Sequence, residues 1–315
     1  MDGAFIIDKP VGLTSHDVVA RVRKIIGERR VGHTGTLDPF ATGVLVTLAG
    51  RATRLAQFLS GADKEYEAVI RFGYATDTGD ITGARIPGDF TTEVRSLTDL
   101  QPEEIEAALK RLRGETEQTP PMYSAKKVGG RKLYELARRG EEVERRSVRI
   151  SVSEFEAIPK HGSFFRVNDD ETADLSVRVV CSAGTYIRTL AEDLGKQMGA
   201  GAHLVELRRT RAGYFRIEDA ITLEQLAELA ESNLVQSRVI PSDAALSHLP
   251  AIELTADEVT QTIHGVDMSV DGQATLNWKD SETVRMRSAN NQLIAVGFYD
   301  ESRSVIHPKV VIGGG

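Results

Sequence analysis

The sequence is poor in cysteine and in long apolar runs, and each absence excludes a class of protein. Cys181 is the sole cysteine among 315 residues, so neither an internal disulfide nor a cluster of thiolate metal ligands can form. No run of about 18 apolar residues is present to span a bilayer. The first residues, MDGAFIIDKP, carry an early acid and lack the basic start of a secretory signal. We therefore expect a cytoplasmic protein with no membrane association.

The usual signatures of nucleotide and metal chemistry are missing as well. The sequence has no glycine-rich loop that ends in Lys-Ser or Lys-Thr and could cradle a phosphate. It has no group of His, Cys, Asp and Glu at metal-ligand spacing. We therefore expect neither a cofactor nor a bound metal.

The balance of charge restricts how this chain could bind a nucleic acid. The net charge is −7, so a basic surface requires cations that gather on one face. Cations do gather along the sequence, in three groups: Arg21, Arg23, Lys24, Arg29 and Arg30; Lys126, Lys127, Arg131, Lys132, Arg138, Arg139, Arg145 and Arg146; and His203, Arg208, Arg209 and Arg211. Such runs are commonly solvated faces. Their position beside candidate site segments also suits RNA.

Residues 31–50, VGHTGTLDPFATGVLVTLAG, place one acid, Asp38, among turn-forming residues just before an apolar run. Residues 44–48 are predicted to form a buried strand, which would hold the loop on a rigid element. The flanking glycines let backbone or ligand come close, and Pro39 fixes the dihedral after the acid. This arrangement suits a reactive carboxylate, although Asp before Pro also opens ordinary turns.

Residues 32–45, GHTGTLDPFATGVL, closely resemble the signature of the TruB family of pseudouridine synthases, which convert a tRNA uridine into pseudouridine. The resemblance implies that Asp38 is the catalytic residue. It also implies that His33 enters the space left when the target base leaves its stack.

Residues 9–19, KPVGLTSHDVV, resemble a second segment of the TruB family, near its start. This match assigns Lys9 and Pro10 a supporting role beneath the active loop. Ser15 is predicted as the N-cap of an amphipathic helix that Gly27 ends.

Residues 64–73, KEYEAVIRFG, alternate as a strand does, with Tyr66 on the apolar face. By propensity alone Tyr66 is a cross-strand core aromatic. The family has a tyrosine in a similar Lys-x-Tyr setting, which implies that its ring packs on the flipped uracil and that its hydroxyl is a candidate proton acceptor. Lys64 could reach a phosphate. Asp77 and Asp80 follow in a segment that lacks the ligand spacing of a calcium loop, and we predict a turn near the RNA surface.

Residues 182–195, SAGTYIRTLAEDLG, predict a strand end, a glycine turn and a helix that carries Arg188 near its start. An arginine there is ordinarily a surface residue. The string closely resembles another TruB segment, whose arginine pairs with the catalytic aspartate. The resemblance therefore implies a contact between Arg188 and Asp38.

Residues 201–215, GAHLVELRRTRAGYF, resemble a further TruB segment. Leu207 matches a leucine that lines the uracil pocket, although a leucine in a strand is a core residue by default. Arg208 and Arg209 are predicted to face the RNA backbone.

Residues 118–140 combine prolines, paired glycines, aromatics and cations, which predicts a projecting loop with a short helix over 132–139. This segment resembles the insertion with which the family clamps the T arm of tRNA. The residues expected to contact phosphates there are Lys126, Lys127, Arg131 and Lys132. A flexible surface hairpin is the plain alternative.

The predicted fold class is mixed α/β: a pseudouridine synthase fold, with a mixed or antiparallel sheet flanked by helices. We expect a catalytic domain over 1–240, with the insertion at about 118–146, and a second domain over 250–315. Short alternating strands in the second domain predict a small barrel, which resembles the PUA-like domain of bacterial TruB enzymes. It could touch the tRNA acceptor stem or serve only as a structural appendage.

The function that the resemblance implies is isomerisation of uridine 55 in the T loop of tRNA, with Asp38 as nucleophile on a flipped-out base. We expect a monomer whose partner is the tRNA T stem-loop. An RNA-binding protein with an inactive site, or one that acts mainly as a tRNA folding helper, is one alternative. A hydrolase that uses Asp38 is another, but it would need a second acid nearby, and none stands out.

Overall fold

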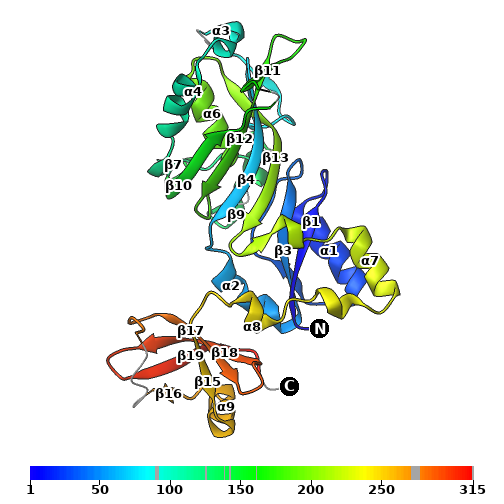
Figure 1. Cartoon of the computed structure of the whole chain (residues 1–315), viewed down its shortest axis with the longest axis vertical. Coiled ribbons are helices and arrows are strands. Elements are labelled where there is room, and N and C mark those ends of the chain that lie inside the picture. The colour runs from blue at the N-terminus through cyan, green and yellow to red at the C-terminus, as the bar shows by residue number, and fades with distance from the viewer. Residues whose placement is uncertain are drawn as a thin grey trace.

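The computed structural model describes residues 1–88, 92–124, 126–137, 139–141, 143–160, 162–270 and 277–313. The molecule is elongated, with a large twisted sheet at one end and a small sheet at the other (Figure 1). In the part of the chain that the structure describes, no helix combines the length and the apolar character needed to cross a bilayer.

The large sheet carries ten strands in the order β1-β3-β13-β4-β12-β10-β7, with β2, β11 and β14 paired to β3, β12 and β13. Their bounds are β1 Gly3–Lys9, β2 Val31–His33, β3 Thr42–Ala49, β4 Lys64–Phe72, β7 Gly114–Gln118, β10 Val148–Ala157, β11 Phe165–Val167, β12 Ala173–Cys181, β13 Ala202–Ala212 and β14 Phe215–Arg216. Strands β3 and β13 pair in parallel, and the other neighbours pair antiparallel. The predicted mixed sheet is therefore confirmed.

Helices cover both halves of this sheet. Their bounds are α1 Ser15–Ile26, α2 Ala56–Leu59, α3 Val94–Thr98, α4 Pro102–Lys110, α5 Leu133–Ala137, α6 Ile187–Gln197, α7 Leu223–Glu231, α8 Ser242–Ala245 and α9 Ala256–Ile263, with 3₁₀ turns at Gly50–Leu55, Ile217–Asp219 and Val235–Arg238. Helices α4 and α6 pack on β4, β10 and β12 in one apolar cluster. Helices α1 and α7 pack on β1 and β3 in another. The alternation of buried residues along β4 follows from the two faces of a strand.

The start of α1 differs from the sequence prediction by one residue. Thr14 is the N-cap: its hydroxyl accepts from the Asp17 N–H, and the Asp17 carboxylate accepts from the Thr14 N–H. Ser15 is instead the first helical residue and is fully buried. The reciprocal bonds of Thr14 and Asp17 satisfy two exposed donors, so the side chain of Ser15 remains free for another contact.

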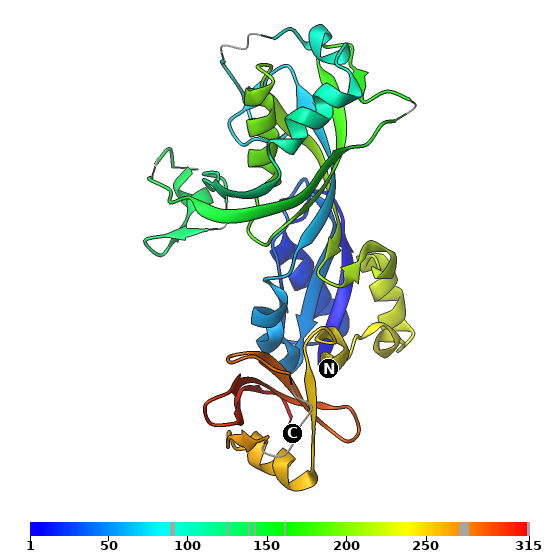
Figure 2. The same cartoon turned by 60° about the vertical axis from the view of Figure 1, so that its left-hand side comes forward.

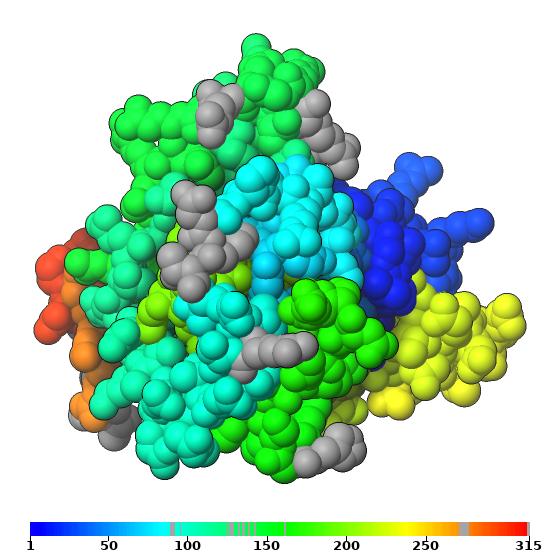
Figure 3. All heavy atoms as spheres, turned by 90° about the horizontal axis from the view of Figure 1, so that it is seen from above, coloured from blue at the N-terminus to red at the C-terminus, as the bar shows by residue number. Residues whose placement is uncertain are grey.

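The segment between β7 and β10 projects from the edge of the sheet (Figure 2), and green atoms of this part of the chain stand out at the top of the space-filling view (Figure 3). It contains a small hairpin, β8 Lys127–Val128 and β9 Arg131–Lys132, followed by α5. Leu133 and Leu136 of α5 are buried, so one face of this short helix is covered. A second hairpin, β5 Ala75–Thr76 with β6 Arg85–Ile86, lies beyond the end of β4.

The small sheet has the order β15-β17-β18-β19-β16 and curls into half a barrel (Figure 2). Its strands are β15 Ala251–Leu254, β16 Met268–Ser269, β17 Thr283–Ser288, β18 Leu293–Asp300 and β19 Val305–Val311. Val296 and Val310 pack in one cluster with Ile6 and Val46 of the large sheet. Shared burial of this kind holds the two sheets in a fixed relation.

Candidate active site

The loop between β2 and β3, which carries Asp38, is fixed by side chains that bond its backbone. Ser15 bonds both polar groups of Leu37: the Leu37 N–H donates to Ser15 Oγ at 2.8 Å, and Oγ donates to the Leu37 carbonyl at 3.1 Å. Lys9 is fully buried and donates from Nζ to the carbonyl of Ala41 at 2.6 Å and to that of Pro39 at 3.3 Å. The residues on both sides of Asp38 are therefore anchored.

Gly43 is required where this loop enters β3. Its φ is +100°, and a Cβ at this position would lie 2.2 Å from the backbone oxygen of Arg209. Only glycine allows β3 and β13 to approach so closely in this conformation. The parallel pairing of Gly43 with Arg209 brings the middle of β13 beneath the loop.

Arg209 occupies a different place from the one predicted. Its side chain is buried, with Nε donating to the Val44 carbonyl at 2.7 Å and Nη2 to the Gly35 carbonyl at 3.0 Å. This position does not favour the expected contact with the RNA backbone, because the side chain is buried and two of its nitrogens already donate to carbonyls of the protein. Arg208 points the other way and pairs with Asp8 at 2.8 Å.

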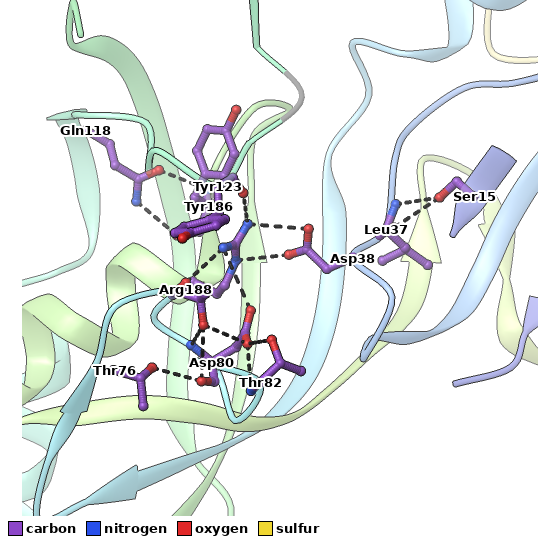
Figure 4. Close-up of polar contacts among 11 residues, drawn as sticks. Ser15, Leu37, Asp38, Thr76, Asp80, Thr82, Gln118, Tyr123, Tyr186 and Arg188 are labelled. Atoms are coloured by element: carbon purple, nitrogen blue, oxygen red, sulfur yellow. Dashed lines mark hydrogen bonds and ion pairs between the residues drawn. The ribbon is translucent and has the colours of Figure 1, made fainter. Parts of the chain in front are cut away.

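Arg188 and Asp38 form a two-point ion pair although they lie 150 positions apart (Figure 4). Arg188 Nε lies 3.0 Å from Asp38 Oδ2, and Nη2 lies 3.3 Å from Oδ1. The remaining guanidinium donors reach the carbonyls of Thr78 at 2.8 Å and Tyr123 at 2.7 Å. A fork of this kind fixes the direction of the carboxylate and favours its charged form.

Asp80 lies on the opposite side of the guanidinium, with Oδ2 at 3.8 Å from Arg188 Nη1. It is buried and accepts from the hydroxyl of Thr78, and from the hydroxyl and the N–H of Thr82. The sequence prediction treated this segment only as a turn and missed Asp80 as a site residue. The Thr-x-Asp-x-Thr spacing was the available signal, since threonines two residues on either side can hold a buried carboxylate.

Two opposing effects set the protonation of Asp38. Burial raises the pKa of its carboxyl above the usual range, and the negative charge of Asp80 raises it further. The Arg188 guanidinium opposes this shift by charge and by hydrogen bonding, and the Lys9 ammonium opposes it by charge. A third of the Asp38 side chain nevertheless remains exposed, toward open space in front of the loop.

That space is a cavity of about 270 Å³. Tyr66, Leu207 and Ile187 supply apolar walls, and Asp38 with Arg188 supplies the charged one. The volume lies just under the range of about 300–1,000 Å³ typical of drug-sized ligands, so it suits one small ring. A second cavity, of about 530 Å³, meets the first at Leu37, Asp38 and Arg188, which line both.

Tyr66 and Lys64 both line the first cavity, from β4. Burial raises the pKa of Tyr66, and the Arg209 guanidinium opposes that shift. Lys64 is buried, its Nζ donates to the carbonyls of Ser60 and Ala62, and burial lowers its pKa to about 8. Its amine thus bonds carbonyls just after the end of α2. A phosphate would have to compete with those carbonyls for the hydrogen bonds of the amine.

His33 lies outside the linings of both cavities, at the end of β2. Its ring meets that of His16 edge to face at 5.4 Å, and its Nδ1 accepts from the Gly35 N–H at 3.3 Å. Burial, with His16 and Arg209 nearby, lowers the pKa of His33 to about 4. The ring is therefore neutral at pH 7.

Of the predicted insertion cations, Arg131 is exposed and Lys126 is half-buried. The side chains of Lys127 and Lys132 lie outside what the structure describes. Among the described residues, no three His, Cys, Asp or Glu side chains gather closely enough to hold a metal ion.

Known proteins resemble this chain along most of its length. A family described as TruB family pseudouridylate synthase (N terminal domain) matches residues 23–187, and one described as tRNA pseudouridylate synthase B C-terminal domain matches residues 188–247. The tRNA pseudouridine synthase B of Geobacillus kaustophilus (strain HTA426) is 46% identical over 267 residues, 84% of this chain and 89% of that protein. The protein of the same name from Solibacter usitatus (strain Ellin6076) is 40% identical over 312 residues, 99% of this chain and 100% of that protein.

Solved structures resemble the fold as well. A chain of a Cbf5-Nop10-Gar1 complex is 29% identical, with a TM-score of 0.73 over 98% of this chain and 84% of that one. A chain of an H/ACA RNP bound to a substrate RNA containing 2′-deoxyuridine is 27% identical, with a TM-score of 0.72 over 99% and 85%. The fold is that of a pseudouridine synthase.

The family follows from the sequence matches. The chain belongs to the TruB family, and it is an enzyme, a tRNA pseudouridine synthase. The sequence-based assignment of family and activity is thereby confirmed.

Proposed function

We propose that this enzyme isomerises uridine 55 in the T loop of tRNA to pseudouridine, with Asp38 as the nucleophile. The observation that carries the proposal is the two-point pair of Asp38 with Arg188 at the wall of a cavity that Tyr66 and Leu207 also line. One small ring can enter there and meet one carboxylate, but a stacked base cannot.

The reaction needs a carboxylate that stays ionised away from water. The bond from uracil N1 to ribose C1′ breaks, the base turns, and C5 bonds to C1′. C5 then loses its proton and N1 gains one, so the product is an isomer of the substrate. Arg188 favours the ionised form of Asp38, by charge and by hydrogen bonding, and so opposes the desolvation that raises the pKa of its carboxyl. The carboxylate can then attack carbon, at uracil C6 or ribose C1′, or stabilise a cationic sugar.

Tyr66 and Leu207 would hold the flipped base in front of Asp38. Extrusion of a base costs roughly a few kcal/mol, which aromatic and apolar contacts in the pocket offset. Because burial raises the pKa of Tyr66, the phenol is neutral at rest. Packing of its ring on uracil is thus better supported than proton abstraction by its hydroxyl.

His33 would fill the vacancy that the base leaves in the loop. The ring is neutral because of its lowered pKa, and it lies on the rigid edge of β2. A neutral planar ring can stack where the base had been, at little desolvation cost.

The projecting segment would grip the T arm. Arg131 is exposed and can contact a phosphate, and we assign the same role to Lys126, Lys127 and Lys132. Arg208 is about 40% exposed although paired, so it can reorient toward a backbone phosphate. Lys64 and Arg209 would contribute without contacting a phosphate, because they hold the backbone that forms the walls of the first cavity.

We further propose that residues 1–240 form the catalytic domain and residues 250–315 a PUA-like domain that lies against the acceptor stem. The curled five-stranded sheet suits a small barrel-like module. The enzyme would act as a monomer in the cytoplasm, where tRNA is its partner.

Incubation of the enzyme with a T-arm stem-loop transcript, followed by nucleoside analysis, tests the proposal. Pseudouridine should form in the transcript with U55 and should be absent from a matched transcript with C55. Unchanged RNA that still binds would indicate an inactive site, and release of free uracil would indicate a hydrolase. Pseudouridine in the C55 transcript would refute the choice of position.

A further inference from the structure

Gln118 makes a two-point contact at the edge of the catalytic centre. It is the last residue of β7, where the projecting segment begins, and its side chain is only 3% exposed. Its Oε1 accepts from the Tyr186 N–H at 2.7 Å, and its Nε2 donates to the Tyr186 carbonyl at 3.1 Å. Figure 4 shows this amide against the backbone just before Arg188. One side chain thus satisfies both polar groups of one peptide residue.

Tyr186 is the N-cap of α6, the helix that carries Arg188. Among the described residues, the Tyr186 side chain makes no capping hydrogen bond, unlike Thr14 at α1, Thr222 at α7 or Thr255 at α9. Its carbonyl already accepts from the Leu190 N–H at 3.2 Å, the first bond of the helix. Gln118 therefore supplies from a distant strand the anchoring that a local cap supplies elsewhere.

The same segment reaches Arg188 directly. The Tyr123 carbonyl accepts from Arg188 Nη2, the nitrogen that also bonds Asp38 Oδ1. The two ends of the projecting segment are joined at its base, where the hydroxyls of Thr119 and Ser147 lie 3.1 Å apart and Arg145 donates to the Pro120 carbonyl at 3.0 Å. A displacement at this base would therefore move both the backbone of Tyr186 and the guanidinium of Arg188, at the start of α6.

We infer that Gln118 is a positioning residue for the Arg188–Asp38 pair, and that through it the base of the RNA-binding segment sets the geometry of the catalytic centre. This inference rests on the proposed function. Gln118 lies outside the linings of both cavities that meet at Asp38, so it acts through Tyr186 and Arg188 rather than on the substrate.

The effect on Asp38 has a definite sign. The charged or titratable groups that act on its carboxyl are Arg188 from α6, Asp80 from the β5–β6 hairpin, Lys9 from β1 and Tyr66 from β4. Of these, Arg188 gives the largest opposition to desolvation. If the start of α6 shifts, the pKa of Asp38 rises further. The ionised fraction then falls at a given pH, and the acid limb of the pH–rate profile moves to higher pH.

Gln118→Met tests the inference, because methionine has similar length and removes both hydrogen bonds. A misplacement of about 1 Å can cost about a hundredfold, so single-turnover pseudouridine formation should fall about tenfold to a hundredfold. The tRNA Kd should stay within about threefold, because the phosphate contacts are unchanged. The acid limb should move to higher pH.

Gln197→Met is the matched control. Gln197 lies at the last turn of the same helix and donates one hydrogen bond, to the Ala108 carbonyl at 3.0 Å. It should lower thermal stability without moving the acid limb. Gln118→Glu keeps the acceptor for the Tyr186 N–H and should restore part of the rate. If Gln118→Met fails to fold, as judged by circular dichroism, Gln118→Asn takes its place, because the shorter amide cannot bond both groups of Tyr186 and adds no charge; its acid limb should likewise move to higher pH.

Three results would overturn the inference: an acid limb identical to that of the wild type, a rate loss no larger than in Gln197→Met, or a loss found only in Kd. Titration of ¹³C-labelled aspartate by NMR follows the Asp38 carboxyl without turnover. A wild type that makes no pseudouridine would refute the proposed function, yet the Asp38 titration of Gln118→Met would still test the positioning role.

Discussion

Lysine and arginine side chains occur both around Asp38 and in the projecting segment. The two groups differ in how far they are buried. Lys9, Arg188 and Arg209 are at most 3% exposed, and each donates to backbone carbonyls of the site. Arg131 is exposed, and Lys126 is half-buried. The first group is committed to holding the protein in shape, whereas the second remains available to a partner.

This difference shows how an acidic chain can both bind RNA and build a charged catalytic centre. A buried cation must have its donors satisfied within the protein, because an unpaired buried charge is costly. It therefore adds little to RNA affinity and much to geometry. An exposed cation adds affinity and salt dependence but positions little. The predictions below test this division.

The largest effect is expected at Asp38, the group that the buried cations serve. Asp38→Asn removes the proposed nucleophile and keeps the shape of the side chain, so pseudouridine formation should fall to the assay background. The tRNA Kd should change by less than about tenfold, since binding rests on phosphate contacts. Nucleoside analysis measures pseudouridine formation, and filter binding measures the tRNA Kd. Asp169→Asn, at an exposed position, is the control, and turnover by Asp38→Asn would remove Asp38 from the mechanism.

The sequence alone predicted that Asp38 and Arg188 meet at this site. The strings around Asp38, Tyr66 and Arg188 implied their roles, and alternation predicted the strand that carries Tyr66. The two-point contact of Asp38 with Arg188 agrees with the implied pairing. Local patterns sufficed there because each residue lies within a long, specific string.

Lys9 was predicted to support the Asp38 loop, and it does bond that loop, but two other positioning residues could not be found in that way. Ser15 acts on Leu37 across 22 positions, and Gln118 acts on Tyr186 across 68. Neither contact leaves a local pattern, because each depends on which elements the sheet brings together. Arg209 was misplaced for the same reason: its string does not reveal that β13 pairs in parallel with β3 at the centre of the sheet.

Loss of the projecting segment should have the next largest effect. Replacement of residues 125–140 by a short Gly-Ser linker removes its exposed cations, so tRNA binding should weaken. The slope of log Kd against log salt should flatten by about 0.7 to 0.9 for each phosphate that the variant no longer neutralises. Binding titrations at low and at near-physiological salt provide the measurement. An unchanged slope would show that the segment is not the clamp.

Arg209→Met should reduce stability rather than RNA affinity. The substitution leaves the carbonyls of Val44 and Gly35 without their donors, at a cost of roughly 1–3 kcal/mol for each buried group. Thermal unfolding should show a Tm lower by several degrees, since 1 kcal/mol corresponds to about 2–4 °C in a domain of this size. The salt dependence of tRNA binding should stay as in the wild type. A flatter salt slope in Arg209→Met would show that Arg209 contacts an RNA phosphate.

Ser15→Ala tests a neutral residue that performs the same task as the buried cations. The Leu37 N–H is left without its acceptor, so the Asp38 loop should shift and the single-turnover rate should fall about tenfold. The tRNA Kd should remain unchanged. Ser153→Ala, which removes one side-chain hydrogen bond, to the Val180 carbonyl far from the Asp38 loop, should leave the rate intact. Equal rates in the two variants would show that the Ser15 contact is only structural.

The smallest effect is expected from a single exposed cation. Arg131→Met removes one charge from β9, where the exposed side chain holds no described part of the fold in place. Thermal stability should be unchanged, because surface substitutions usually stay within about 0.5 kcal/mol. The salt slope of tRNA binding should fall by about 0.7 to 0.9, the value for one phosphate contact. Arg131→Lys should restore the slope, and Lys160→Met, at an exposed lysine outside the segment, should leave it unaltered. Because Arg209→Met is expected to change Tm without changing the slope, and Arg131→Met the reverse, a shared pattern in the two variants would contradict the division between buried and exposed cations.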